Sequence, residues 1–154
     1  MRPPPFQAFL EDHREPVYRF LRALLGPQEA EDGFQETFLA ALRAYPRLRD
    51  GSNLRAWVMT IAHRKAVDAH RRRAQGAEPV GEVPDRAGPG NPEPPDEEIW
   101  RRVRALPAGQ RTAVFLRYAG DLAYRDVARV MGISEAAARQ SVRAGLRRLR
   151  EEWT

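Results

Sequence analysis

The fold of the C-terminal part of the chain is specified by residues 122–150, LAYRDVARVMGISEAAARQSVRAGLRRLR. Apolar residues recur there at helical spacing in two runs, which are separated by Gly132 and Ile133. Glycine readily adopts the left-handed conformation that ends a helix, and Ser134 can cap the following helix with its hydroxyl. The spacing therefore predicts a helix-turn-helix, a motif whose second helix enters the major groove of DNA.

The second of these helices combines a buried stripe with a polar, arginine-rich face. Its stripe consists of Ala138, Val142, Gly145 or Leu146, Leu149 and Trp153. On the polar face, Arg139, Gln140 and Arg143 are candidates for base contacts, because arginine matches guanine and glutamine matches adenine. An amphipathic helix with a solvated arginine face would show the same pattern, but the preceding turn favours DNA binding. The predicted DNA-binding residues are Ser134, Glu135, Arg139, Gln140, Arg143 and Arg147, the last of them suited to phosphate.

The charge of the whole chain agrees with a polyanionic partner. Its 154 residues include 25 arginines, one lysine and 21 acids, which give a formal net charge of +5. A genome whose base composition favours arginine codons explains the excess equally well, so the positions of the charges must decide. The net charge is +4 over residues 1–73, −6 over residues 74–98 and +7 over residues 99–154. Two basic segments with an acidic segment between them suit two separate patches of one nucleic acid.

The acidic middle segment, residues 74–98, is predicted to be a flexible linker. It holds six prolines, four glycines and no aromatic residue in 25 positions. Such a segment buries too little apolar surface to offset the entropy of ordering it. The sequence therefore predicts an all-α protein with two small helical domains, residues 1–73 and 99–154, joined by this linker.

Three helical apolar patterns occupy the first of these domains, at residues 6–24, 30–45 and 54–73. Pro16 is expected to bend the first pattern or to start a new turn within it. Gly26 and Pro27 break the chain before the second pattern. Ser52 or Asn53 can cap the third helix. No alternating pattern of a β-strand is present.

Several classes of function are excluded or disfavoured. The chain has no cysteine, so it can form neither a disulfide nor a thiolate metal site. Its three histidines, His13, His63 and His70, lack metal-ligand spacing, and no phosphate-binding loop or nucleophile motif occurs. No signal peptide and no apolar run long enough to span a membrane is found. We therefore expect a cytoplasmic protein that is not an enzyme and that uses no cofactor, metal or membrane.

The order of short motifs along the chain resembles one family, the extracytoplasmic-function (ECF) group of sigma-70-type bacterial RNA polymerase sigma factors. The segments that carry the resemblance are AEDGFQETF at 30–38, WVMTIA at 57–62, DAHRR at 68–72, LPAGQR at 106–111, LRY at 116–118 and LAYRDVA at 122–128. Each motif is weak alone, but their joint order around a linker is specific.

The resemblance implies a function for each domain. The first domain would be region 2, which binds the polymerase clamp and the −10 promoter element. The second would be region 4, which binds the polymerase flap and recognises the −35 element. The positions that match the clamp-facing motif are Asp32, Gln35 and Glu36. Core RNA polymerase and promoter DNA would be the partners, and the family allows for an anti-sigma factor as a third.

The same resemblance implies which residues hold the −10 element. Residues 47–56 match the loop that captures unpaired bases, and Trp57 can stack on a base, although its apolar stripe favours core packing. The basic end of the same helix is suited to phosphate. The residues expected at the −10 element are Asn53, Arg55, His63, Arg64, Lys65, Arg71 and Arg72.

The chain departs from the family pattern at several positions. Arg64 stands where many relatives have an asparagine tied to a captured −10 base, so the −10 preference cannot be transferred. Gly33 replaces a large apolar residue and is expected to weaken its helix by about 0.5–1 kcal/mol. Small residues in the last helix, Ala138 and Gly145 among them, predict a lightly packed second domain.

Two other functions explain the sequence less completely than a sigma factor does. A helix-turn-helix regulator that does not join polymerase would explain residues 122–150 but not the motif at residues 30–38. A nucleic-acid enzyme would need clustered acids to hold metal ions, and the sequence does not supply them.

Overall fold

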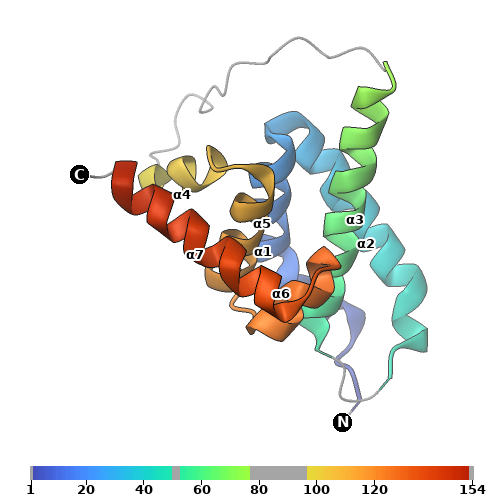
Figure 1. Ribbon diagram of the computed structural model, residues 1–154. Coiled ribbons are helices and arrows are strands. Elements are labelled where there is room, and N and C mark those ends of the chain that lie inside the picture. Colours follow the sequence, from blue (N-terminus) through green and yellow to red (C-terminus); the bar gives the residue numbers. More distant parts are fainter. Residues whose placement is uncertain (1, 50–52, 77–96, 153–154) are drawn as a thin grey trace.

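The computed structural model describes residues 2–49, 53–76 and 97–152. Most of the predicted linker, Ser52 and Trp153 lie outside these residues. The described residues form seven α-helices, one short 3-10 helix and no strand, which confirms the all-α prediction (Figure 1). The helices are α1 (Phe6–Leu25), α2 (Pro27–Ala44), α3 (Leu54–Ala74), α4 (Glu97–Arg104), α5 (Ala108–Tyr118), α6 (Tyr124–Met131) and α7 (Glu135–Glu152), and the 3-10 helix η1 covers Tyr45–Arg47.

The first lobe is the bundle of α1, α2 and α3 around a core that includes Phe9, Phe20 and Met59. Gly26, at φ +82°, separates α1 from α2, and Pro27 begins α2, as the sequence predicts. Pro16 lies inside α1, which continues as one helix through it. The expected new turn is therefore not formed.

Gly33 has a structural role that the sequence pattern did not indicate. It is buried in α2 against α1, and a Cβ atom on it would lie 3.2 Å from Leu25 Cδ1 and 3.5 Å from Leu21 Cδ2. The glycine thus allows the two helices to approach closely. The glycine lowers the helix propensity of α2, and in return it allows α2 to pack closely on α1.

The second lobe, α4 to α7, contains the predicted helix-turn-helix in α6 and α7. Gly132 adopts the left-handed conformation at φ +68°, and Ser134 Oγ accepts a hydrogen bond from the Ala137 backbone N–H at 3.0 Å. Ala138 and Val142 are fully buried and fix the orientation of α7. The predicted turn and cap of this motif are confirmed, and so is the inward stripe from Ala138 to Leu149.

The expectation of a lightly packed second lobe is wrong at Gly145. A Cβ atom at this position would lie 2.7 Å from Val114 Cγ2 and 3.4 Å from Leu106 Cδ1. The small residue lets α7 lie directly on α5, so the absence of bulk allows tight packing.

Replacing Gly145 with valine is therefore expected to destabilise the protein. The added side chain overlaps Val114, and overpacking of this kind costs about 1–3 kcal/mol. Urea unfolding followed by circular dichroism measures the change. The control is Gly109→Val, at an α5 glycine whose Cβ would meet no atom within 4 Å. Equal loss of stability in both variants would mean that propensity, and not packing, determines the cost.

The two lobes pack against each other. Helix α3 of the first lobe lies beside α6 of the second, and α1 lies beside α5 (Figure 1). The rings of Phe20 and Phe115 meet across this contact with their centroids 5.8 Å apart. One hydrophobic cluster runs through both lobes, and a smaller cluster of Val103, Leu106, Val114 and Leu149 lies in the second lobe.

Candidate nucleic-acid interface

The arginine face of α7 is exposed, as the helix-turn-helix plan requires. Ala138, Val142 and Leu149 are buried against the rest of the lobe. The side chains predicted to contact DNA lie on the opposite side and are all exposed: Ser134, Glu135, Arg139, Gln140, Arg143 and Arg147. Ser134 also accepts the capping hydrogen bond, so its hydroxyl has a structural role in addition to any role at DNA.

The side chain of Arg139 is held in place by contacts within the free chain. Its Nη2 lies 2.8 Å from Glu135 Oε1, and its guanidinium carbon lies 4.6 Å from the centroid of the Tyr124 ring. The guanidinium of Arg117 also lies over Tyr124, at 5.0 Å, and donates to the Leu122 carbonyl at 3.3 Å. Cation–π contacts of this kind restrict an arginine side chain without using its hydrogen-bond donors.

Sequence reasoning missed Tyr124 as a part of this interface. The residue begins α6, and its ring reaches the first turns of α7 because the two helices pack together. The only sequence signal is an aromatic residue at the start of the first helix of the motif. Its pairing with Arg139 depends on the angle between the helices.

The residues expected at the −10 element are divided by the structure into two groups. Arg64, Arg71 and Arg72 are exposed on α3, and Lys65 is half-buried. Asn53, which is exposed, and Arg55 and His63, which are half-buried, lie where α3 meets the second lobe. The seven residues therefore do not form one continuous exposed surface.

Asn53 connects its own helix to the second lobe. Its Oδ1 accepts from the Ala56 backbone N–H at 3.1 Å, which makes it the N-cap of α3. Its Nδ2 donates to Asp126 Oδ2 of α6, also at 3.1 Å. Both ends of the amide are thus used within the chain.

Arg55 has three partners, one on each nitrogen. Its Nε donates to His13 Nδ1 at 2.8 Å, its Nη1 to the Gly120 carbonyl at 3.3 Å and its Nη2 to the Asp12 carbonyl at 3.5 Å. Asp12 stands four residues before Pro16, which has no N–H for the usual helical bond. The Asp12 carbonyl therefore lacks its usual helical donor, and Arg55 donates to it instead.

The two histidines at this contact are kept neutral by their surroundings. Burial and then the Arg55 guanidinium lower the pKa of His13 below its ordinary 6.5, which Asp12 partly offsets. Burial likewise lowers the pKa of His63, while a hydrogen bond to the Val130 backbone acts in the opposite direction. Both rings lie near aromatic side chains, His13 beside Phe9 and His63 beside Phe20.

Stability is therefore expected to fall in mildly acidic solution. Because the folded pKa of each histidine is below the unfolded value, their stabilising effect is present above about pH 6.5 and is lost as the pH falls through the lowered values. Urea unfolding from about pH 7.5 to about pH 5.5 measures this. A His13→Asn, His63→Asn variant should lose the part of the slope that the histidines supply. An unchanged slope in that variant would assign the pH dependence to other groups.

A second exposed surface lies on α2. Asp32, Gln35 and Glu36 are exposed there, and Leu39 and Leu42 continue the same face with 53% and 50% of their surfaces accessible. Sequence reasoning named the three polar residues and missed the two leucines. Their spacing of four and seven residues from Gln35 was the available signal.

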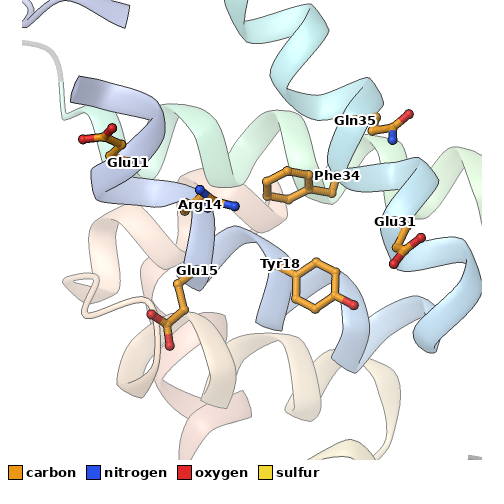
Figure 2. Close-up of a pocket in the computed structure, with 7 residues that line it drawn as sticks. All are labelled: Glu11, Arg14, Glu15, Tyr18, Glu31, Phe34 and Gln35. Carbon is orange, nitrogen blue, oxygen red and sulfur yellow. The ribbon is translucent and has the colours of Figure 1, made fainter. Parts of the chain in front are cut away.

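A cavity between α1 and α2 adjoins this surface (Figure 2). It has a volume of about 700 Å³, and Gln35 and Glu31 belong to its α2 side. The rings of Tyr18 and Phe34 lie inside it with their centroids 6.0 Å apart. The other lining residues are Glu11, Arg14 and Glu15, so carboxylates outnumber cations on its walls.

Over the described ranges 2–49, 53–76 and 97–152, no group of three or more histidine, aspartate or glutamate side chains is placed to hold a metal ion. Within the same ranges, no helix has the length and apolar character needed to cross a membrane.

Family models match both lobes. The model of Sigma-70 region 2 matches residues 9–75, and the model of Sigma-70 region 4 matches residues 96–149. The ECF RNA polymerase sigma factor SigD of Mycobacterium tuberculosis is 34% identical over 93% of this chain and 74% of its own length. The RNA polymerase sigma factor CarQ of Myxococcus xanthus is 30% identical over 95% of this chain and 87% of its own.

A solved structure is similar over both lobes. It is that of the sigma factor RpoE of Bartonella quintana in complex with the anti-sigma factor NepR. The TM-score is 0.77 at 25% identity, and the match covers 95% of this chain and 94% of that protein.

Two helical lobes, one of them with a helix-turn-helix that exposes an arginine face, define a DNA-binding transcription factor. The family models that match both lobes, and the relatives that match over most of this chain, show more: the chain belongs to the ECF group of the sigma-70 family of RNA polymerase sigma factors. The family expected from the sequence is confirmed. Members of this family direct polymerase to promoters when transcription starts, so a regulator that acts apart from polymerase is not favoured.

Proposed function

We propose that this sigma factor uses three surfaces to bind polymerase and to recognise its promoter. The face of α2 binds the polymerase clamp, α3 and the residues before it hold the −10 element, and α7 recognises the −35 element. The second lobe also binds the flap. The observation that carries this proposal is the exposed row of Arg139, Gln140, Arg143 and Arg147 on the second helix of a helix-turn-helix.

The α2 face suits a protein partner and not DNA. Carboxylates at Asp32 and Glu36 repel phosphate, and the two exposed leucines, Leu39 and Leu42, offer apolar surface at the same place. A polar rim around apolar anchors is the usual composition of a protein interface. The leucines supply binding energy here, and the charges orient the partner.

At the −35 element, Arg139 and Gln140 lie early on α7, where the helix enters the major groove. Arg139 arrives with its guanidinium already stacked on Tyr124, so less side-chain entropy is lost on binding. Arg147 lies two turns further along and binds phosphate, which adds affinity without sequence preference.

At the −10 element, the protein acts by binding and not by bond chemistry. Arg64, Arg71 and Arg72 of α3 attract the phosphates, and Asn53 and Arg55 hold unpaired bases. Strand separation is favoured because the separated strand gains these contacts. The protein is therefore not an enzyme, needs no cofactor and works in the cytoplasm with polymerase.

An anti-sigma factor is a further proposed partner. The structural neighbour from Bartonella quintana was solved with such a protein, and the likeness extends over both lobes. The accessible α2 face is the surface at which an inhibitor would exclude polymerase.

Run-off transcription with core polymerase tests the proposed function. The template carries a promoter identified by mapping transcription starts after overproduction of the factor. We expect a transcript from this template only when the chain is added. Tight binding of duplex DNA by the chain alone, with no binding to core polymerase and no transcript, would contradict it.

A further inference from the structure

We propose that Tyr45 is a positioning residue for the −10 element, which joins the N-terminal proline segment, residues 2–5, to two elements beside the −10 site. These elements are the 3-10 helix η1 and the first turn of α3. The inference rests on the proposed −10 role of Asn53 and Arg55. It gives the segment before α1 a part in promoter recognition that no motif in the sequence indicated.

The hydroxyl of Tyr45 fixes the segment before α1 at the end of α2. It donates a hydrogen bond to the carbonyl of Pro4, a residue 41 positions away in the chain. Residues 2–5 run past the end of α2 and the start of α3, where this bond is made (Figure 1). Burial raises the pKa of Tyr45 above its ordinary 10.0, so the hydroxyl keeps the proton that it donates.

The ring of Tyr45 belongs to an aromatic cluster that connects η1 with α1 and α3. The ring centroids of Phe6 and Phe9, both on α1, each lie 5.2 Å from that of Tyr45. From α3, the Trp57 ring lies 6.3 Å from Tyr45 and 5.7 Å from Phe9. Tilted and edge-on pairs of this kind add stabilisation beyond the area that they bury. One cluster therefore fixes the placement of η1 relative to α3.

The two elements that this cluster joins carry exposed polar side chains. Arg47 ends η1 and Asn53 caps α3, and both are exposed. Tyr45 lies two residues before Arg47. Trp57 lies two residues after Arg55 on α3. A binding site needs its side chains held within about 0.5 Å of the productive geometry, and the contact between the Tyr45 and Trp57 rings supplies that constraint here.

The proline segment is suited to hold Tyr45 because its backbone is stiff. Pro3, Pro4 and Pro5 each have a fixed φ, and a residue that precedes proline is confined to extended backbone. Pro5, at the N-cap of α1, has φ −53° and ψ 146°, which is close to the polyproline geometry. Little conformational entropy is therefore lost when the Pro4 carbonyl is fixed at the hydroxyl.

The first test is Tyr45→Phe, which removes one hydroxyl and leaves the ring in its cluster. The holoenzyme is formed with a saturating concentration of the factor, so that differences in polymerase binding do not contribute. Permanganate reactivity of unpaired thymines measures melting of a mapped promoter and of versions with single −10 substitutions. We expect Tyr45→Phe to lower the discrimination between −10 bases about 3- to 10-fold, the range expected for the loss of one hydrogen bond. Affinity for a −35 duplex should equal that of the wild type.

The matched control is Tyr18→Phe. Tyr18 is also a half-buried tyrosine of the first lobe, but it lines the cavity between α1 and α2 and lies outside the aromatic cluster around Tyr45. Removal of its hydroxyl should leave −10 discrimination unchanged. If Tyr45→Phe also keeps full discrimination and changes only the free energy of unfolding, its hydrogen bond is purely structural and the inference is wrong.

Deletion of residues 2–5 tests the segment itself and does not depend on a change at Tyr45. It removes the Pro4 carbonyl that accepts the hydrogen bond. We expect the deletion to reproduce the loss of −10 discrimination seen with Tyr45→Phe. The combined variant should lose no more than either change alone, because both remove the same interaction. Additive losses would mean that the segment and the hydroxyl act separately, which overturns the inference.

A separate measurement distinguishes failure of this inference from failure of the proposed −10 site. If Asn53→Ala and Arg55→Ala leave promoter melting by the holoenzyme unchanged, the −10 assignment is wrong and the inference is wrong with it. If these two variants impair melting while Tyr45→Phe and the deletion do not, the −10 site stands and only the positioning role of Tyr45 is wrong.

Discussion

Replacing both Leu39 and Leu42 with alanine is expected to weaken binding to core polymerase about 30-fold. Each leucine exposes about half of its surface on α2, and its burial in an interface contributes about 1 kcal/mol. Loss of both therefore removes about 2 kcal/mol, which corresponds to that factor. Because alanine favours the helix and the leucines contribute little to the core, the free energy of unfolding should stay within about 0.5 kcal/mol of wild type.

The matched control is Val67→Ala on α3. Val67 is also an exposed apolar residue of the first lobe, at 38% accessibility, and it lies on α3 and not on the α2 face that is proposed to bind the clamp. Fluorescence titration of labelled chain with core polymerase measures both affinities. If the double leucine variant binds as tightly as Val67→Ala, the clamp-binding surface lies elsewhere on the molecule.

The second large effect is expected at the −35 element. Arg139→Ala should reduce discrimination against a substituted −35 base by about 1–3 kcal/mol at one position, which is about 5- to 150-fold. Arg147→Ala should weaken binding evenly across sequences and lower the salt slope by about one unit. Competition binding with a set of −35 duplexes that differ at single positions separates the two results. Equal, sequence-independent losses would mean that the recognition surface is misplaced.

Tyr124 should affect the same specificity without touching a base. Tyr124→Leu removes the ring on which Arg139 rests, 4.6 Å away, and is expected to reproduce part of the Arg139→Ala specificity loss. Tyr124→Phe keeps the aromatic face and should restore discrimination. A leucine variant with normal base preference, alongside an impaired Arg139→Ala variant, would show that the stacking contact has no role in recognition.

The local elements of this protein were predictable because short-range chemistry determines them. Gly132 ends α6, Ser134 caps α7 and Asn53 caps α3 at the positions that the sequence indicates. The inward stripe of α7 follows from helical spacing alone. The family could be named in the same way, since its motifs are segments of contiguous residues.

Other features were missed or misjudged because they depend on helices meeting in space. Gly33 and Gly145 look like weak helix formers in the sequence, yet each allows a close contact with another helix. Tyr124 looks like an ordinary first-turn residue until α7 brings Arg139 onto its ring. Helix α1 is continuous through Pro16, because the loss of one hydrogen bond is a local cost that the packing of α1 in the core outweighs.

The sequence by itself determined the helices, the turn and cap of the DNA-binding motif, the opposed charges of the segments and the sigma-factor family. Those properties follow from spacing, capping and composition within short stretches of chain. Only the tertiary structure decided that α3 packs on α6, so that Asn53 and Arg55 meet acceptors more than sixty residues away in the chain. The physical reason is that such a contact depends on the shape and polarity of two assembled surfaces, and no local pattern in either segment encodes the other.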